Sequence, residues 1–119
     1  AIIQNVKITQ SEDKSISVGE ASVVKILNSQ LEDNNIAVAV KDGSVARIEE
    51  TNFLNNKMQL SAYKKNLQYG SGGKILVKKS VFNSFVNKFT SKKSTIDIED
   101  TLFVGKIIRE GKSIFINER

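Results

Sequence analysis

The sequence predicts an all-β protein, a single-stranded right-handed parallel β-helix of about five coils. Two observations predict this fold. Side chains of the same type recur about every 22 residues, and the short apolar segments within each repeat alternate with a period of two. A coil accounts for both, because each turn supplies three short strands that pair in parallel with their copies one turn later, about 4.8 Å away. A sandwich or barrel gives no reason for identical positions to recur at this interval.

The repeat is clearest where residues 22–38 align without gaps on residues 44–60. Apolar residues then meet apolar residues, and Asn34 meets Asn56. The alignment predicts an asparagine ladder, in which the two amides bond along the stack at a turn that needs a left-handed residue. It also predicts an apolar column formed by Leu31, Phe53, Phe82 and Phe103.

The repeat continues toward the carboxyl end with two changes of spacing. The interval from Ile48 to its counterpart Val77 is longer than the first repeat, and the interval from Val77 to Ile98 is slightly shorter. The additional residues of the longer interval fall within residues 63–73, which we predict to be an inserted loop. Residues 114–116 resemble the start of one more coil.

One stretch leaves the secondary structure open. In residues 81–89, four apolar side chains stand at helical spacing: Phe82, Phe85, Val86 and Phe89. The repeat places Phe82 in a strand, which favours an aromatic stack in the core. A short helix is the alternative, because short apolar runs fit both elements.

Composition bounds the domain and its chemistry. The 119 residues fit one domain, residues 1–119. Cysteine and histidine are absent, which excludes disulfides, cysteine nucleophiles, ordinary zinc sites and histidine acid–base chemistry. We predict no metal and no cofactor. No apolar run approaches about 18 residues, so no membrane-spanning helix is expected. The chain starts at Ala1 without a signal stretch, so we expect a mature form or a piece of a longer protein.

The net charge of +5 comes from lysines that are scattered along the chain. Such a surface attracts anions weakly, and a solvated exterior without a partner is the plain alternative. The basic residues lack the interleaved aromatic platform of known nucleic-acid modules. The sequence therefore predicts no nucleic-acid partner.

The register brings one set of charged residues together. Glu20 and Asp42 stand one repeat apart, Lys41 adjoins Asp42, and Lys64 comes one coil further on. Two carboxylates that are close raise the pKa of one of them or bind a cation. These four residues are therefore a candidate ligand or cation site. The alternative is that both carboxylates accept turn amides and pair with nearby lysines.

The inserted loop at 63–73 is the second candidate site. It carries Tyr63, Lys65 and Tyr69, and loops that project from a regular scaffold often recognise ligands. Tyrosine rings and lysines suit a sugar or an anionic polymer, although the rings could also pack on the coil wall. Arg47 alternates outward from Ile48, and we interpret it as a surface charge.

Several segments resemble a known group: residues 13–20 (DKSISVGE), 39–44 (AVKDGS), 55–57 (NNK) and 62–66 (AYKKN). They resemble right-handed β-helix repeats of the pectate-lyase superfold, and more narrowly the β-helical segments of bacterial surface proteins that accompany spore-coat-protein-H-like kinase modules. The resemblance spans roughly residues 13–105. It implies an extracellular or cell-surface location, but the superfold carries many activities and therefore implies no single one.

We predict a non-catalytic structural or binding module of a bacterial surface or secreted protein, with an anionic or neutral polysaccharide as its partner. Unpaired strand edges at the end coils, such as the edge near Ile2 and Ile3, predict self-association. The alternative is a carbohydrate-active enzyme, a polysaccharide lyase or hydrolase, that acts through Glu20 and Asp42. The absence of histidine and of a clustered acidic set favours the binding module.

Overall fold

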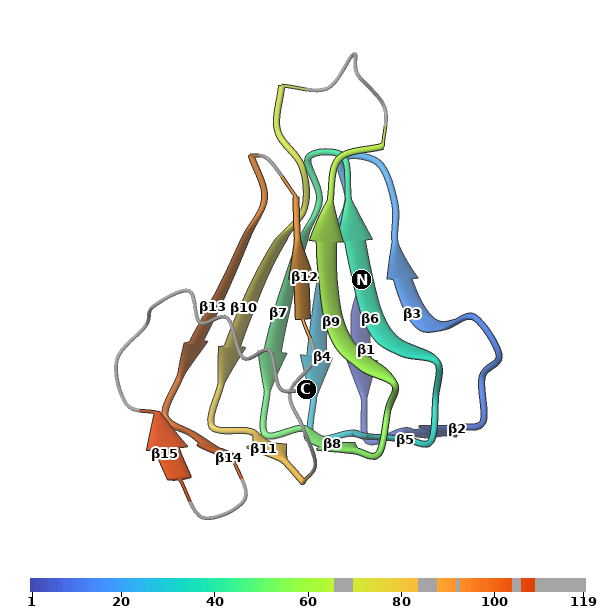
Figure 1. The fold of residues 1–119 in the computed structure, drawn as a ribbon, viewed down its shortest axis with the longest axis vertical. Helices are drawn as coiled ribbons and strands as arrows, with labels where there is room; N and C mark the ends of the chain where they lie inside the picture. Colours follow the sequence, from blue (N-terminus) through green and yellow to red (C-terminus); the bar gives the residue numbers. More distant parts are fainter. Residues whose placement is uncertain (66–69, 84–87, 92, 104–105, 109–119) are drawn as a thin grey trace.

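The computed structural model describes residues 1–65, 70–83, 88–91, 93–103 and 106–108, and every regular element in these ranges is a β-strand (Figure 1). The strands are β1 (Ile2–Gln4), β2 (Lys7–Thr9), β3 (Lys14–Val18), β4 (Val23–Leu27), β5 (Gln30–Glu32), β6 (Ile36–Lys41), β7 (Val45–Glu49), β8 (Asn52–Leu54), β9 (Met58–Tyr63), β10 (Lys74–Lys78), β11 (Val81–Phe82), β12 (Lys88–Thr90), β13 (Thr95–Glu99), β14 (Thr101–Phe103) and β15 (Lys106–Ile108). The predicted all-β class is confirmed.

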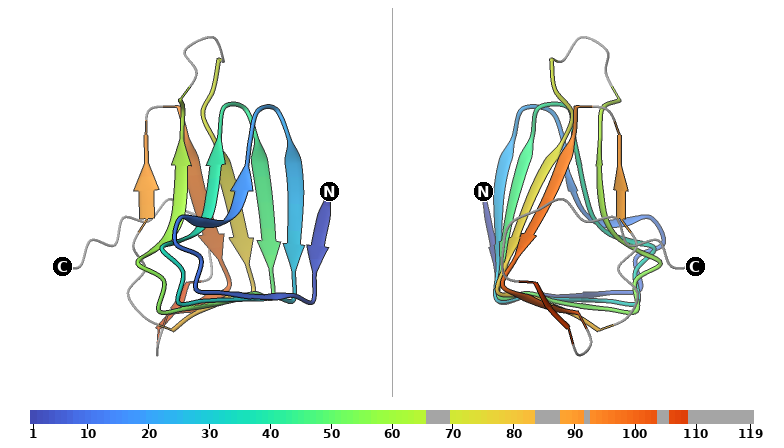
Figure 2. Two further views of the ribbon diagram at one scale, coloured as in Figure 1. Left: turned by 90° about the vertical axis from the view of Figure 1, so that its right-hand side faces the viewer. Right: turned by 60° about the vertical axis from the view of Figure 1, so that its left-hand side comes forward.

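The strands form three sheets that enclose a triangular cross-section (Figure 2). Sheet A has the order β1-β4-β7-β10-β13, sheet B the order β15-β14-β11-β8-β5-β2, and sheet C the order β12-β9-β6-β3. From β1 to β14, every third strand therefore returns to the same sheet, as the predicted parallel β-solenoid requires. In the described ranges the chain completes about four turns, and β13 and β14 begin another. The right hand of the coil stays a prediction, and the coil predicted at residues 114–116 lies outside the described residues.

The pairing register confirms the repeat. Ile26 pairs with Ile48, Ile48 pairs with Val77, and Val77 pairs with Ile98, as the sequence alignment predicts. The pairs are parallel, with one exception: β15 pairs with β14 in the antiparallel direction. The stretch from 81 to 89, for which a helix was the alternative, includes β11 and the first two residues of β12, while residues 84–87 lie outside the described part of the chain.

The core consists of apolar columns that run along the solenoid. Ile26, Ile48, Ile75, Val77, Ile96 and Ile98 come from sheet A and are buried. The predicted column of sheet B is confirmed: Leu31 pairs with Phe53, whose ring stacks on Phe82 at 4.5 Å between centroids. Phe103 continues it with an edge-on contact at 5.1 Å. Such aromatic pairs add about 0.5–1.5 kcal/mol to the stabilisation from burial.

The corner from sheet A to sheet B repeats one device in every turn. A single left-handed residue turns the chain at Asn5, Asn28, Glu50, Lys79 and Asp100, with φ between 45° and 59°. The next position carries a buried hydroxyl at Ser29, Thr51, Ser80 and Thr101. Thr51 Oγ1 donates to the Glu49 carbonyl (3.0 Å), and the Thr51 N–H donates to Ser80 Oγ of the next turn (3.2 Å). These bonds offset the cost of about 1–2 kcal/mol for each left-handed residue that is not glycine.

The corner from sheet B to sheet C holds the predicted asparagine ladder. Asn34 Nδ2 donates to Asn56 Oδ1 (3.0 Å), and the same oxygen accepts the Asn34 N–H (2.9 Å). Asn56 Nδ2 donates to the Leu31 carbonyl (2.9 Å) and to Gln59 Oε1 (2.7 Å). The ladder is confirmed, but the left-handed residue of each turn is the preceding one, Asp33 with φ 58° and Asn55 with φ 55°. The buried amides therefore link the turns while their exposed neighbours bend the chain.

Candidate functional site

The corner from sheet C to sheet A differs from the other two. It comprises residues 19–22, 42–44, 64–65 and 70–73, and 91 with 93–94, which connect β3 to β4, β6 to β7, β9 to β10 and β12 to β13. The connection after β9 falls in the predicted insertion at 63–73, except that Tyr63 is still the last residue of β9. Its described residues, 64–65 and 70–73, lie at the top of Figure 1. Most of the residues that the sequence singled out as candidates lie at this corner.

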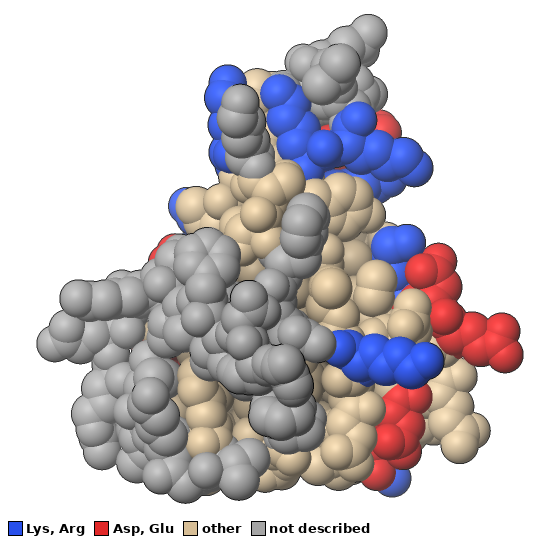
Figure 3. All heavy atoms as spheres, viewed as in Figure 1, with Lys and Arg blue, Asp and Glu red and all other residues tan. Residues whose placement is uncertain are grey.

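Among the residues that the structure describes, five lysines follow the corner along the solenoid: Lys41, Lys64, Lys65, Lys74 and Lys93. We call this set the lysine edge. Lys65, Lys74 and Lys93 are exposed, and the other two are half-buried. None of the five forms an ion pair with a carboxylate of the residues described above. Lys and Arg side chains accordingly gather at the top of the molecule in Figure 3. The described residues of this corner thus include more cations than carboxylates, since Glu20 and Asp42 lie there beside the five lysines, and an excess of one charge attracts ions of the opposite sign.

Asp42 lies below the lysine edge and is 1% exposed. It has a left-handed backbone with φ 50°, and its Oδ1 accepts the Lys65 N–H at 2.7 Å. The Asp42 N–H in turn donates to the Tyr63 carbonyl at 3.3 Å. The carboxylate thereby ties the start of the inserted loop to the turn before it, which is the turn-amide role that the sequence left open for it.

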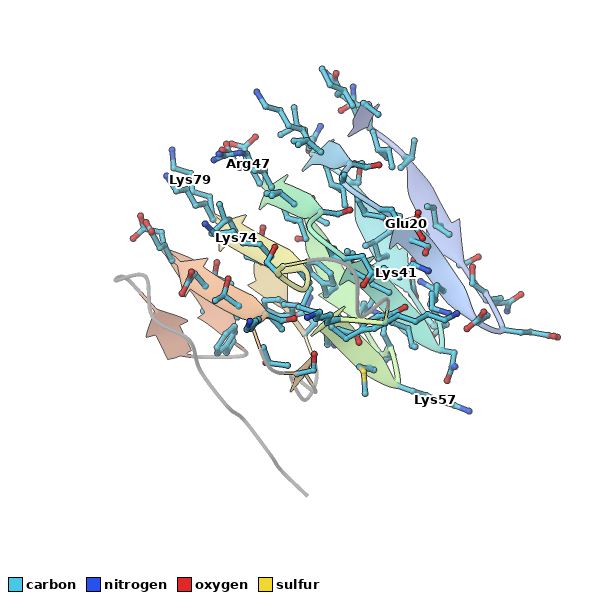
Figure 4. The ribbon with its side chains drawn as sticks, turned by 90° about the horizontal axis from the view of Figure 1, so that it is seen from above. Glu20, Lys41, Arg47, Lys57, Lys74 and Lys79 are labelled. Carbon is cyan, nitrogen blue, oxygen red and sulfur yellow. The ribbon has the colours of Figure 1, made fainter. Side chains whose placement is uncertain are left out.

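Glu20 is exposed at the same corner, one turn earlier. The Ala21 N–H donates to the Asp42 carbonyl at 3.0 Å, which confirms that the two turns lie one above the other. Seen from above, Glu20 and Lys41 both lie along this corner, whereas Arg47 and Lys79 lie on the side of sheet A (Figure 4). Glu20 and Asp42 thus share a corner on neighbouring turns, as predicted, but one carboxylate faces solvent and the other is buried.

The inserted loop meets the next turn through its backbone. The Lys64 N–H donates to Ser91 Oγ (3.0 Å), and half-buried Tyr63 closes β9 beside Lys41, its register partner in β6. Tyr69 lies outside the described residues. The structure therefore places Tyr63 and Lys65 at the lysine edge.

The loop returns to sheet A through two buried glycines. The Gly72 carbonyl accepts the Gly43 N–H and the Gly72 N–H donates to the Lys93 carbonyl, both at 2.9 Å. A Cβ atom at Gly73 would overlap the carbonyl oxygen of Val40, and one at Gly72 would overlap Ser94 Oγ. At Gly73 the overlapping atoms belong to the backbone, so the close approach of Val40 requires a residue without a side chain there.

Sequence reasoning missed two members of the lysine edge. Lys74 and Lys93 are separated from Lys41 by the insertion, so a constant repeat length does not reach them. The longer repeat interval, which aligns Ile48 with Val77, also aligns Lys74 with Val45, the first residue of β7. This alignment could have placed Lys74 next to the corner before the structure was known. Arg47 is exposed in the middle of β7, in agreement with the interpretation as a surface charge.

The corner offers cations, hydroxyls and backbone amides. Among the described residues no group of three or more Asp or Glu side chains could hold a metal ion. The same ranges contain no helix that is long and apolar enough to cross a membrane. The arrangement is suited to holding an anion by charge and hydrogen bonding.

Comparison with protein-family models, with curated proteins and with solved structures gives no significant match to this chain. The resemblance of residues 13–105 to pectate-lyase-like repeats and to kinase-associated segments therefore stays a prediction.

Proposed function

We propose that this chain is a non-catalytic binding module of a bacterial surface or secreted protein, and that it holds an anionic polysaccharide along the lysine edge. The observation that carries the proposal is the alignment of five lysines without an ion-pair partner among the described carboxylates. Two lysines elsewhere are engaged in such pairs, since Lys7 lies 3.7 Å from Glu32 and Lys14 lies 3.3 Å from Asp13.

The geometry of the solenoid favours a linear polymer. Successive turns are about 4.8 Å apart, so an extended chain lying along the axis would meet cations from several turns. Each contact is weak because the lysines are exposed or half-buried. A polymer with a negative charge on every sugar compensates for weak single contacts by making several at once.

The enzyme alternative rests on Glu20 and Asp42. Burial of Asp42 and its bond to the Lys65 amide support a structural role for this carboxylate. We therefore favour binding without turnover. A bacterial surface location, the right-handed coil and the pectate-lyase-like family are part of the proposal on the strength of the sequence resemblance alone.

The binding experiment compares two ligands of equal length, an oligoglucuronate and a neutral oligoglucan, by calorimetry. We expect the acidic oligomer alone to bind, with an affinity that falls as salt screens the lysines. The double variant Lys41→Ala/Lys65→Ala should bind about fivefold to tenfold more weakly, because each exposed charge contributes up to about 1 kcal/mol. The matched control is Lys25→Ala/Lys79→Ala, which removes the same charge from sheet A and its far corner.

Several outcomes would contradict the proposal. Equal binding of both sugars would show that charge is not recognised. Equal loss in the control variant would show that only net charge matters. Tighter binding of a single-stranded oligonucleotide of the same charge would point to a nucleic-acid partner. Release of new reducing or unsaturated sugar ends during the titration would favour the enzyme alternative.

We also propose that the chain self-associates, with a second copy pairing on the exposed strand edges of the first turn. β1, β2 and β3 each lie at the edge of their sheet, Ile2 is 63% exposed, and Ile3 and Ile8 are only partly buried. At the opposite end, β15 covers the edge of β14. Exposed strand edges favour pairing with another chain. Sedimentation velocity should show a dimer whose fraction rises with concentration and falls in Ile2→Lys; a monomer at all concentrations would contradict this.

A further inference from the structure

A groove lies beside the lysine edge on the side of sheet A. Its volume is about 270 Å³, and its walls come from Gly43, Ser44, Val45, Ser71, Gly72, Gly73, Lys74, Lys93 and Thr95. None of these residues is acidic. The groove is too small for a polymer, since pockets for drug-sized molecules hold about 300–1,000 Å³, and it is large enough for one charged group on a sugar.

The floor of the groove is backbone, and three glycines make it so. Gly43 and Gly72 are joined by a hydrogen bond of 2.9 Å, and a side chain at Gly72 or Gly73 would collide with the neighbouring turns. The groove is therefore a consequence of the insertion, which brings the chain back between the turn of Gly43 and that of Lys93. The strands that begin beside it, β7, β10 and β13, are paired in register.

The rim of the groove carries ammonium and hydroxyl groups that can donate hydrogen bonds to an anion. Lys74 begins β10 and pairs in register with Thr95 of β13, so a cation and a hydroxyl stand side by side on neighbouring strands. The Gly72 N–H donates to the Lys93 carbonyl, which places Lys93 against the floor. Both lysines and the side chains of Ser71 and Thr95 are exposed. Two ammonium groups and two hydroxyls can all donate to oxygen, and oxyanions accept several such bonds at once.

We propose that this groove is an oxyanion subsite, which holds one carboxylate or sulfate group of an acidic sugar between Lys74 and Lys93. The inference deepens the proposed function and rests on it, because it gives the lysine edge a defined position for one charge of its ligand. It does not require a polymer, so it can be tested with small molecules whether or not a polysaccharide binds.

The test is a titration of the full chain at constant ionic strength, followed by backbone amide chemical shifts. The probes are sodium glucuronate, glucose as the neutral counterpart, and inorganic sulfate. We expect glucuronate, sulfate or both to shift the amides of Gly72, Gly73 and Thr95, whereas glucose leaves them unchanged. The stronger of the two anions identifies the charged group that the subsite prefers.

Variants separate a subsite from general attraction. Lys74→Ala and Lys93→Ala should each weaken the apparent affinity by at least about threefold, and Lys79→Ala, just beyond the opposite end of β10, should leave it unchanged. Unperturbed spectra of the variants without ligand show that they fold. Shifts spread over all lysine-rich surfaces, equal effects of all three variants, or no shift with either anion would overturn the inference. Binding of the small anions without the oligoglucuronate would leave the subsite standing and refute the polymer.

Discussion

At both the corner from sheet B to sheet C and the corner from sheet C to sheet A, the chain must turn into the next sheet and keep its buried backbone groups hydrogen-bonded. The two corners do this differently. At the first, Asn34 and Asn56 satisfy buried backbone groups with side-chain amides, and the connections have three to five residues. At the second, the connection after β9 is much longer than its neighbours, and glycines allow the backbone to close the gap. The corner from sheet B to sheet C therefore links the turns through buried side-chain amides. The corner from sheet C to sheet A links them through backbone hydrogen bonds and carries the lysine edge on its surface.

This difference suggests that the first corner contributes more to stability, and it is consistent with our proposal that the second corner binds a ligand. Each buried polar group that loses its hydrogen-bond partner costs about 1–3 kcal/mol. Substitution of Asn34 or Asn56, at the corner from sheet B to sheet C, should therefore reduce stability. An exposed lysine contributes little to stability, so substitutions at the exposed members of the lysine edge, Lys65, Lys74 and Lys93, should change stability little. Substitutions at the two corners should therefore separate unfolding from binding.

The largest effect is expected from Asn56→Ala. The change leaves the buried Asn34 N–H and the Leu31 carbonyl without their partner, and the free energy of unfolding should fall by about 3 kcal/mol. Urea denaturation followed by circular dichroism measures it. Asn52→Ala is the control, because Asn52 is exposed in β8 and should change stability by less than about 0.5 kcal/mol. Equal losses in the two variants would show that the ladder is not what links the turns.

A somewhat smaller effect is expected from Gly73→Ala. The new methyl group would meet the Val40 carbonyl, and overpacking of this kind costs about 1–3 kcal/mol. Gly19→Ala, at the same corner of the first turn, has nothing within 4 Å and should be nearly neutral. The same denaturation experiment applies. A neutral Gly73→Ala would mean that the insertion does not return against β6 in the way described.

Asp42 tests whether its charge or its hydrogen bond matters. Asp42→Ala removes the acceptor of the Lys65 N–H and should cost about 1–2 kcal/mol. Asp42→Asn keeps an oxygen acceptor and suits a left-handed backbone, so both stability and glycan binding should survive. A loss of binding or turnover in Asp42→Asn, with stability intact, would instead assign the carboxylate to a ligand or catalytic site.

The smallest effect on stability is expected at the lysine edge itself. The free energy of unfolding of Lys41→Ala/Lys65→Ala should lie within about 0.5 kcal/mol of that of the unmodified chain, whereas its affinity for the acidic oligomer should be lower. Thermal denaturation without ligand is the measurement. A marked loss of stability would show that these lysines hold the corner together and that the weaker binding follows from unfolding.

Sequence reasoning predicted the parts of the molecule in which a side chain must stack on its own copy. The Phe53 and Phe82 column and the asparagine ladder were predictable, because burial fixes their identity in each turn. The left-handed positions were harder, since Glu50 and Lys79 adopt φ of 50° where asparagine or glycine is usual. The groove beside Gly72, Gly73 and Lys74 was not predictable, because it depends on how the insertion returns through Gly73, and the length of a loop does not determine its path.

We propose that the lysine edge binds an anionic polysaccharide, whereas Asn34 and Asn56 link neighbouring turns and bind no ligand. The most direct measurement is a map of backbone amide shifts across the full chain during titration with the oligoglucuronate. The account predicts shifts confined to Lys41, Tyr63, Lys64, Lys65, Gly72, Gly73, Lys74 and Thr95, with the amides of Asn34 and Asn56 unchanged. Shifts centred on Asn34 and Asn56, or an unchanged spectrum at saturating ligand, would contradict it.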